Sequence, residues 1–95
     1  MHFVAICRDR PDGLQTRLAH RPRHLEWLDA GDGTIRLAGP ILDADGETPR
    51  GSIFILEAED AGAARAFLAT DPYNDGDLFA SVELLPWRRT VGAEV

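Results

Sequence analysis

Residues 51 to 58 restrict the fold more than any other stretch, because the run from Ile53 to Leu56 has no polar side chain on either face. The side chains of a strand point alternately to its two faces, so a strand over this run is apolar on both. Residues 2 to 8 (HFVAICR) follow a similar pattern. Both segments are typical of central strands that are covered on two sides. The chain is therefore predicted to form a sheet with two faces to bury.

One long helix is predicted from Leu14 to about Ala30. Its apolar stripe, at 3.6 residues per turn, is expected to pack on the sheet and consists of Leu14, Leu18, Leu25 and Leu28. Pro22 lies inside this segment and lacks a backbone N–H, so the segment forms either one kinked helix or two helical pieces. We favour one kinked helix.

The other segments complete a β-α-β-β-α-β order. Further strands are predicted over residues 34–38, 51–58 and 78–87, and a second helix over residues 61–69. Gly39-Pro40 is expected to end the second strand, and Asp60 to cap the second helix. This order is that of the ferredoxin-like α+β fold, an antiparallel sheet with two helices on one face.

The length of 95 residues indicates one domain over residues 1–95, with residues 88–95 as a loosely held tail. A domain of this size buries too little surface to build a deep pocket alone. Because the helices cover only one face of the sheet, the second apolar face needs another cover. A second copy of the chain is the simplest one, so we expect a homodimer.

The net charge of −6 and the absence of lysine exclude several functions. Nucleic acid is an unsuitable partner because the chain has no surplus of cations, and without lysine neither a Schiff base nor a Walker-type phosphate site can form. Cys7 is the only cysteine, which excludes an intrachain disulfide and fits a reducing compartment. Residues 2 to 6 are too short an apolar run for a signal peptide or a membrane span. We expect a cytoplasmic protein that does not bind membranes.

His24 and Asp71 are the strongest candidates for chemistry. Asp71 precedes Pro72, which favours an extended backbone and allows its carboxylate to turn inward. His24 lies on the flank of the leucine stripe, together with Arg17 and Arg21. If the fold joins His24 and Asp71, the pair can transfer a proton near neutral pH. Asp71 can also cap the following turn, and we expect one of its oxygens to serve each role.

Three further residues are candidate substrate ligands. Arg21 can bind an anionic group, although a surface salt bridge is the commoner use of arginine. Ser52 and Tyr73 can line a pocket with hydroxyl groups. Cys7 lies within an apolar strand and is expected to be a core residue, not a nucleophile.

Metal binding is a minor alternative. His20 and His24 are four residues apart, a spacing that suits two ligands of one metal, and Asp71 could supply a third. Asp43 and Asp45 suggest a calcium loop only weakly, since further oxygen ligands at the required spacing are missing. We expect no metal and no organic cofactor.

Several motifs together resemble the YCII-related family of the dimeric α+β barrel group. They are Arg17-Leu18, Arg21-Pro22-Arg23-His24-Leu25, Leu37-Ala38-Gly39-Pro40, Gly51-Ser52, Asp71-Pro72-Tyr73 and Pro86-Trp87. The resemblance implies a ferredoxin-like dimer with an active site that contains the histidine and the aspartate matching His24 and Asp71. One branch of the family is similar to a dehydrochlorinase that acts on a chlorinated hydroxyquinol.

These observations lead to two functional hypotheses. The first is an enzyme of the lyase or isomerase type, in which His24 transfers a proton while Asp71 orients the imidazole and holds its charge. The alternative is a non-catalytic module for ligand binding or dimerisation. A cleft that contains both side chains favours the enzyme, and a filled, dry interface favours the module.

Overall fold

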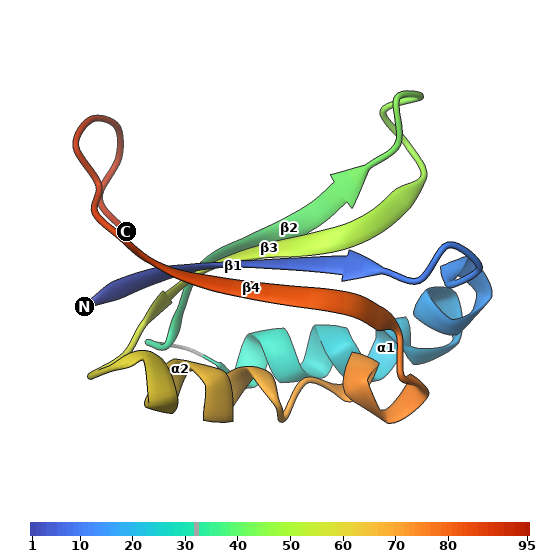
Figure 1. Cartoon of the computed structure of the whole chain (residues 1–95), viewed down its shortest axis with the longest axis horizontal. Coiled ribbons are helices and arrows are strands. Elements are labelled where there is room, and N and C mark those ends of the chain that lie inside the picture. The colour runs from blue at the N-terminus through green and yellow to red at the C-terminus, as the bar shows by residue number, and fades with distance from the viewer. Residues whose placement is uncertain (32) are drawn as a thin grey trace.

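The computed structural model of the chain describes residues 1–31 and 33–95 and has the predicted order of elements. These are β1 (His2–Asp9), α1 (Leu14–Ala30), β2 (Ile35–Leu42), β3 (Pro49–Glu57), α2 (Ala61–Leu68), the short 3-10 helix η1 (Pro72–Gly76) and β4 (Phe79–Trp87). The strands form one sheet in the order β2-β3-β1-β4, and all neighbours are antiparallel. Both helices lie on the same face of this sheet (Figure 1). The ferredoxin-like α+β fold is therefore confirmed.

The core lies between the sheet and the helices. Alternate residues of β1 point into it, and the buried apolar side chains of this cluster are Phe3, Ala5, Cys7, Phe54, Leu56, Ala64, Leu68 and Leu84. Helix α2 packs on the sheet through its buried residues Ala64 and Leu68. Its first turn is capped as predicted, since Asp60 Oδ1 accepts a hydrogen bond from the Ala63 N–H at 2.8 Å.

The prediction for the leucine stripe of α1 is wrong for three of its four members. Leu14, Leu18 and Leu25 are 38–49% exposed, whereas the buried residues of this helix are Arg17 and His24. Polar groups can be buried at moderate cost when each has a hydrogen-bonding partner, and both of these residues have one. The helix therefore packs on the sheet through a different face from the one that hydropathy indicates. It is a single helix that includes Pro22.

Strand β2 is longer than predicted. Gly39-Pro40 does not end it, because the strand continues to Leu42 and Pro40 pairs with Ser52 of β3. Strand β2 lies at the edge of the sheet. An edge strand tolerates proline because no neighbouring strand needs a hydrogen bond from the N–H groups on its open side. The turn after β2 is closed by Asp45, whose carboxylate accepts hydrogen bonds from Glu47 and Thr48. These hydrogen bonds lower the pKa of Asp45 to about 2.

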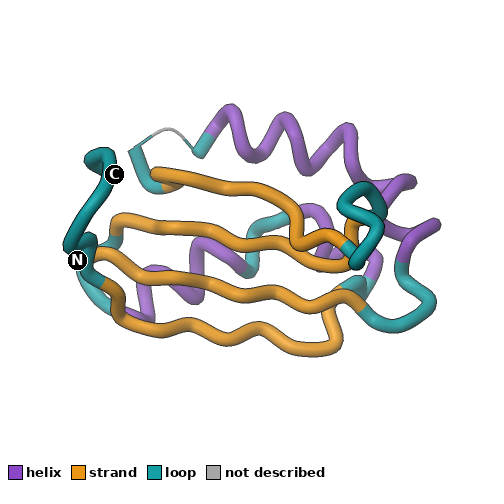
Figure 2. The backbone as a smooth tube through the Cα atoms, turned by 90° about the horizontal axis from the view of Figure 1, so that it is seen from above, coloured by secondary structure: helices purple, strands orange, loops and turns teal. Residues whose placement is uncertain are grey.

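The helices leave the opposite face of the sheet open (Figures 1 and 2). The strand register places on this face the side chains of Val4, Ile6, Leu37, Ile53, Ile55 and Leu85. Three of them are large and well exposed, namely Leu37 (57%), Ile53 (42%) and Leu85 (47%). The second, mainly apolar face that the sequence predicts is therefore present, and it also carries the ion pair of Arg8 and Glu83.

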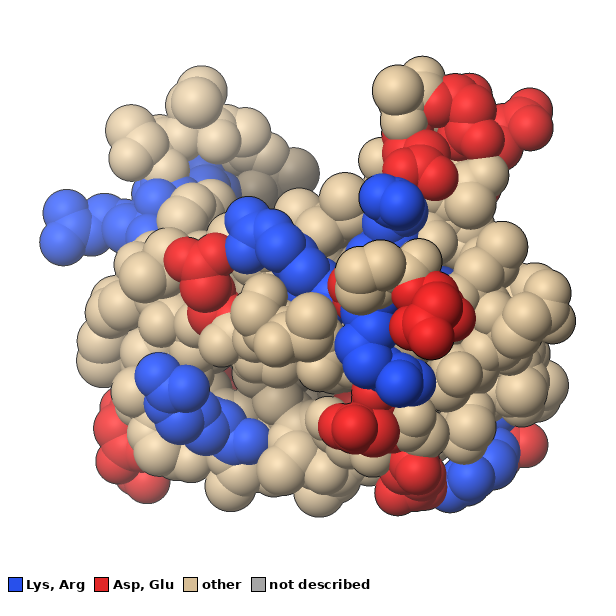
Figure 3. Space-filling view, turned by 45° about the vertical axis from the view of Figure 1, so that its right-hand side comes forward, with Lys and Arg blue, Asp and Glu red and all other residues tan. Residues whose placement is uncertain are grey.

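Charged side chains are mixed on the molecular surface. On the face shown in Figure 3 the arginines lie among carboxylates, and acidic side chains gather on the projecting turn between β2 and β3. Among the described residues, no helix is long and apolar enough to span a membrane.

Gly51 provides a test of the packing between β1 and β3. A Cβ at this position would lie 2.4 Å from the Cys7 carbonyl oxygen and 3.0 Å from Ile41 Cδ1, so strands must move apart to admit it. We expect Gly51→Ala to lower the free energy of unfolding by about 1–3 kcal/mol, measured by chemical denaturation. Gly39→Ala is the matched control, because nothing lies within 4 Å of a Cβ there. Equal effects of the two substitutions would contradict this account of the packing.

Candidate functional site

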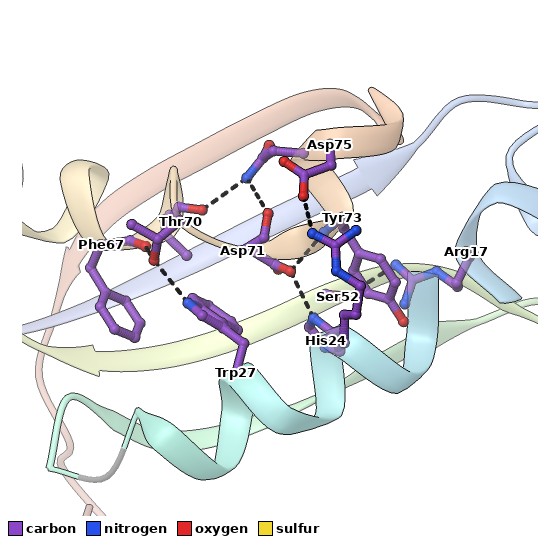
Figure 4. A network of polar contacts seen from close by, with 12 residues as sticks. Arg17, His24, Trp27, Ser52, Phe67, Thr70, Asp71, Tyr73 and Asp75 are labelled. Atoms are coloured by element: carbon purple, nitrogen blue, oxygen red, sulfur yellow. Dashed lines mark hydrogen bonds and ion pairs between the residues drawn. The ribbon is translucent and has the colours of Figure 1, made fainter. Parts of the chain in front are cut away.

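Helix α1 and the segment after α2 bring His24 and Asp71 together. The imidazole Nδ1 lies 2.8 Å from Asp71 Oδ1, and the two side chains are 8% and 1% exposed (Figure 4). His24 and Asp71 are therefore in contact, which is the condition that the predicted proton-transfer pair has to meet. Since an ionised carboxylate only accepts hydrogen bonds, Nδ1 carries the proton whenever Asp71 is ionised. The other ring nitrogen, Nε2, has no hydrogen-bond partner among the described residues.

The local sequence fixes the position of Asp71. Its backbone is extended, with φ −62° and ψ 125°, and Pro72 begins η1. Asp71 Oδ1 also accepts the Tyr73 N–H at 3.0 Å, so the capping role that the sequence suggested is present. The expected division of one oxygen for each role is wrong, because Oδ1 serves both. Oδ2 is buried without a hydrogen-bond partner among the described residues.

Tyr73 stacks on the imidazole. The ring centroids of Tyr73 and His24 are 4.0 Å apart, with an interplanar angle of 16°. The guanidinium carbon of Arg17 lies 4.6 Å from the centroid of Tyr73, and Figure 4 shows the tyrosine between the arginine and the histidine. Burial is the main cause that raises the pKa of Tyr73, so its phenol remains protonated at neutral pH.

Arg17 is a site residue that the sequence analysis placed on the same flank of the helix as His24 but did not name as part of the site. Its side chain is 4% exposed, and it donates through Nε and Nη2 to the two carboxylate oxygens of Asp9, at 2.7 and 2.8 Å. Nη2 also donates to Ser52 Oγ at 3.0 Å. Burial alone lowers the pKa of Arg17, but the hydrogen bonds and charges of Asp9 and Tyr73 together raise it above its usual value. The signal was its spacing of seven residues, two helical turns, before His24.

A cavity of about 470 Å³ opens beside these residues, between α1 and strands β2 and β3. Four of the five predicted site residues line it, namely Arg21, His24, Ser52 and Tyr73. Asp71 is not part of this lining and lies behind His24. The outward-facing Leu18 and Leu25 of α1 form an apolar wall of the cavity. The cleft therefore contains one member of the predicted pair and is supported by the other.

A second polar contact joins the same two segments close to Asp71. The indole N–H of Trp27 donates to Thr70 Oγ1 at 2.8 Å, and the Thr70 hydroxyl lies 2.6 Å from the Phe67 carbonyl oxygen (Figure 4). The rings of Trp27 and Phe67 stack with centroids 4.9 Å apart. Trp27 follows His24 by one turn of α1. These contacts help to hold the segment with Asp71 against the helix that carries His24.

The residues considered for metal binding, and the Cys7 thiol, have other roles in the structure. His20 Nδ1 lies 2.9 Å from the Thr16 carbonyl oxygen. Asp43 pairs with Arg50, and no group of three potential metal ligands occurs among the described residues. Cys7 is buried, and burial is the main cause that raises the pKa of its thiol to about 12. Such a thiol is almost entirely protonated at neutral pH and is a poor nucleophile.

Comparison with known proteins finds relatives that match nearly the whole chain. A family model of the YCII-related domain matches residues 1–88. Protein YciI of Escherichia coli O6:H1 is 32% identical over 96 residues, and a protein of Haemophilus influenzae is 34% identical; each match covers 94% of this chain and 98% of the relative. Among solved structures, the 5-chloro-2-hydroxyhydroquinone dehydrochlorinase of Burkholderia phenoliruptrix AC1100, in complex with 2,5-dihydroxybenzoquinone, has a TM-score of 0.87. It is 32% identical, and the match covers 95% of this chain and 96% of that chain.

The buried pair of Arg17 and Asp9 is expected to be important for stability. Arg17→Met leaves the Asp9 carboxylate buried without a partner, which should lower the free energy of unfolding by about 3–5 kcal/mol. Arg23→Met in the same helix is the control, since Arg23 and Asp75 form an ion pair with side chains more than half exposed. That substitution should change stability by less than about 1 kcal/mol in thermal or chemical denaturation. Comparable losses in both variants would argue against a structural role of the buried pair.

Proposed function

The chain belongs to the YCII-related family, and from this membership we propose that it is a small-molecule enzyme that uses His24 and Asp71 for proton transfer. The observation that carries the proposal is the buried 2.8 Å contact between these side chains, with His24 on the lining of a cavity. Asp71 holds the proton on Nδ1 of the imidazole. Nε2 then has a free electron pair, as a general base requires.

The proposed reaction is of the lyase or isomerase type. In the first step, His24 Nε2 removes a proton from the bound substrate and becomes positively charged. The Asp71 carboxylate stabilises this charge through the hydrogen bond at Nδ1. In an isomerisation, His24 then returns the proton to another atom of the substrate. In a loss of HCl, the electron pair of the broken C–H bond forms the new π bond, chloride leaves as an anion with the electron pair of the C–Cl bond, and His24 releases the proton to solvent. A dehydrochlorinase removes HCl, a reaction that needs such a base, and the dehydrochlorinase of known structure is 32% identical to this chain.

Arg21, Ser52 and Tyr73 are proposed to bind the substrate. All three line the cavity together with His24. Tyr73 also keeps the imidazole in place by stacking on it at 4.0 Å. Neither a metal nor an organic cofactor takes part in the proposed proton transfer, because a positioned histidine and carboxylate are sufficient for it.

The alternative is a non-catalytic module that binds a small acidic or phenolic ligand. It is favoured by the second role of Asp71, which caps η1 through the Tyr73 N–H and thus has a structural reason to be present. The two functions differ in what His24 must do. An enzyme requires its proton transfer, whereas a binding module requires only its shape and hydrogen bonds.

A chloride-release assay with 5-chloro-2-hydroxyhydroquinone tests the enzymatic proposal. His24→Gln removes the base and should lower kcat by about 10²–10⁴-fold. His20→Gln is the control, because His20 is on the same helix and contacts the Thr16 carbonyl, outside the His24–Asp71 pair. It should retain activity within about twofold. Undiminished turnover in His24→Gln contradicts the mechanism, and no chloride release by the unmodified protein favours the binding module.

The open face of the sheet is proposed to pack against a second copy in a homodimer. Its exposed Leu37, Ile53 and Leu85 form an apolar surface of the kind that marks an interface. The same face of a second copy is complementary to it by symmetry. We place this dimer in the cytoplasm, where the thiol of Cys7 stays reduced.

Light scattering tests the dimer. The unmodified chain should have about twice the monomer mass of 10.4 kDa. Leu85→Asp puts a charge on the open sheet face and should yield the monomer, because burying an unpaired carboxylate costs several kcal/mol. Leu14→Asp makes the same change on α1, on the opposite side of the sheet, and should leave the mass unchanged. A monomer mass for the unmodified chain at micromolar concentration contradicts this assembly.

A further inference from the structure

The polar groups around Arg17 give the cavity a definite chemical preference. A guanidinium only donates hydrogen bonds, and Arg17 directs Nε and Nη2 to Asp9 and Nη2 also to Ser52. The Tyr73 hydroxyl also interacts with this guanidinium, and the contact helps to raise the pKa of Arg17. Arg17 lines the cavity, and its contacts with Asp9, Ser52 and Tyr73 hold the guanidinium in one orientation there.

Ser52 supplies a hydrogen-bond donor. Its side chain is buried within the site, with the residue 3% exposed, and Oγ accepts a hydrogen bond from Arg17 Nη2 at 3.0 Å. Since Arg17 supplies its own hydrogen to that contact, the hydroxyl hydrogen of Ser52 must point elsewhere. Ser52 lines the cavity, so a bound acceptor can receive this hydrogen. Arg17 therefore orients Ser52 as a donor.

Arg21 supplies the charge. Arg21 lies one turn after Arg17 on α1 and lines the same cavity. The charge of Arg17 is balanced by Asp9, whereas Arg21 has no ion-pair partner among the described residues. The lining contains one carboxylate, that of Glu47, which comes from the turn between β2 and β3 and not from the helix. The helix side of the cavity thus holds the hydrogen-bond donors and Arg21, whose charge no ion pair among the described residues balances.

The rest of the lining is mainly apolar and includes Leu18, Leu25, Ala38, Pro40 and Phe54. We propose that the cavity binds a largely apolar molecule that carries an oxyanion, a carboxylate or a phenolate. Arg21 and Ser52 hold the oxyanion, and Arg17 is the positioning residue for Ser52. This inference rests on the proposed function for the use of the cavity, and it names the class of substrate that His24 would meet there.

Benzoate and benzamide are suitable probes, because they have nearly the same shape and differ in charge. Their dissociation constants are measured by NMR titration, with the ring signals of Tyr73 and His24 as reporters. Benzoate should bind about tenfold more tightly than benzamide. Ser52→Ala should weaken benzoate severalfold and benzamide less, since a hydrogen bond to the charged oxyanion is stronger than one to the neutral amide oxygen.

The exposed arginines of α1 provide a matched pair of charge variants. Arg21→Gln should abolish most of the preference for benzoate. Arg23→Gln makes the same change two residues away, at a side chain that pairs with Asp75 and does not line the cavity, and it should keep the preference. Equal effects of the two variants would show that only the overall charge matters and would overturn the proposal.

Two other results would also overturn it, namely equal affinity for benzoate and benzamide, or no saturable shift of Tyr73 and His24 with benzoate. None of these measurements depends on turnover. A failure here therefore leaves the proton transfer by His24 open to its own test. Conversely, an unchanged rate in His24→Gln would leave the anion preference of the cavity intact.

Discussion

Helix α1 packs on the sheet through two buried polar side chains, Arg17 and His24, each of which has its own carboxylate. The carboxylates come from different parts of the chain, Asp9 from the end of β1 and Asp71 from the segment before η1. Removing one partner would leave the other buried and unsatisfied, which is far more costly than losing an exposed pair. The orientation of the helix is therefore set by polar contacts, and its leucines turn toward the cavity and the solvent.

This arrangement also prepares the site before any ligand arrives. His24 is held by Asp71 on one edge and by the ring of Tyr73 on one face, and Tyr73 in turn lies against Arg17. Asp71 is fixed because its Oδ1 also accepts the Tyr73 N–H. A side chain whose neighbours already determine its rotamer loses little entropy on binding. The contacts that stabilise the fold are thus the same contacts that orient the imidazole.

The sequence was sufficient for the fold and for the His24–Asp71 pair, but not for the face that α1 buries. Strand periodicity and the Asp-Pro step are local signals, and they predicted the order of elements and the inward turn of Asp71. Arg17 can be buried because it binds Asp9 and Ser52. Ser52 is 35 residues away in the sequence, so no local pattern reveals that the guanidinium of Arg17 has these partners. The continuation of β2 through Pro40 likewise depends on its edge position, which only the assembled sheet defines.

The two faces of the sheet serve separate purposes in the proposed molecule. The cavity lies on the helix side, where Ser52 and Phe54 of β3 point, while Ile53 and Ile55 of the same strand point to the open face. A strand that is apolar on both sides thus contributes to the site with alternate residues and to the proposed dimer with the others. The polar contacts of the site are made within one chain, where Arg17 binds Asp9 and Ser52 and His24 binds Asp71. Assembly through the open face would add stability to the sheet that supports the site without supplying any of its polar groups.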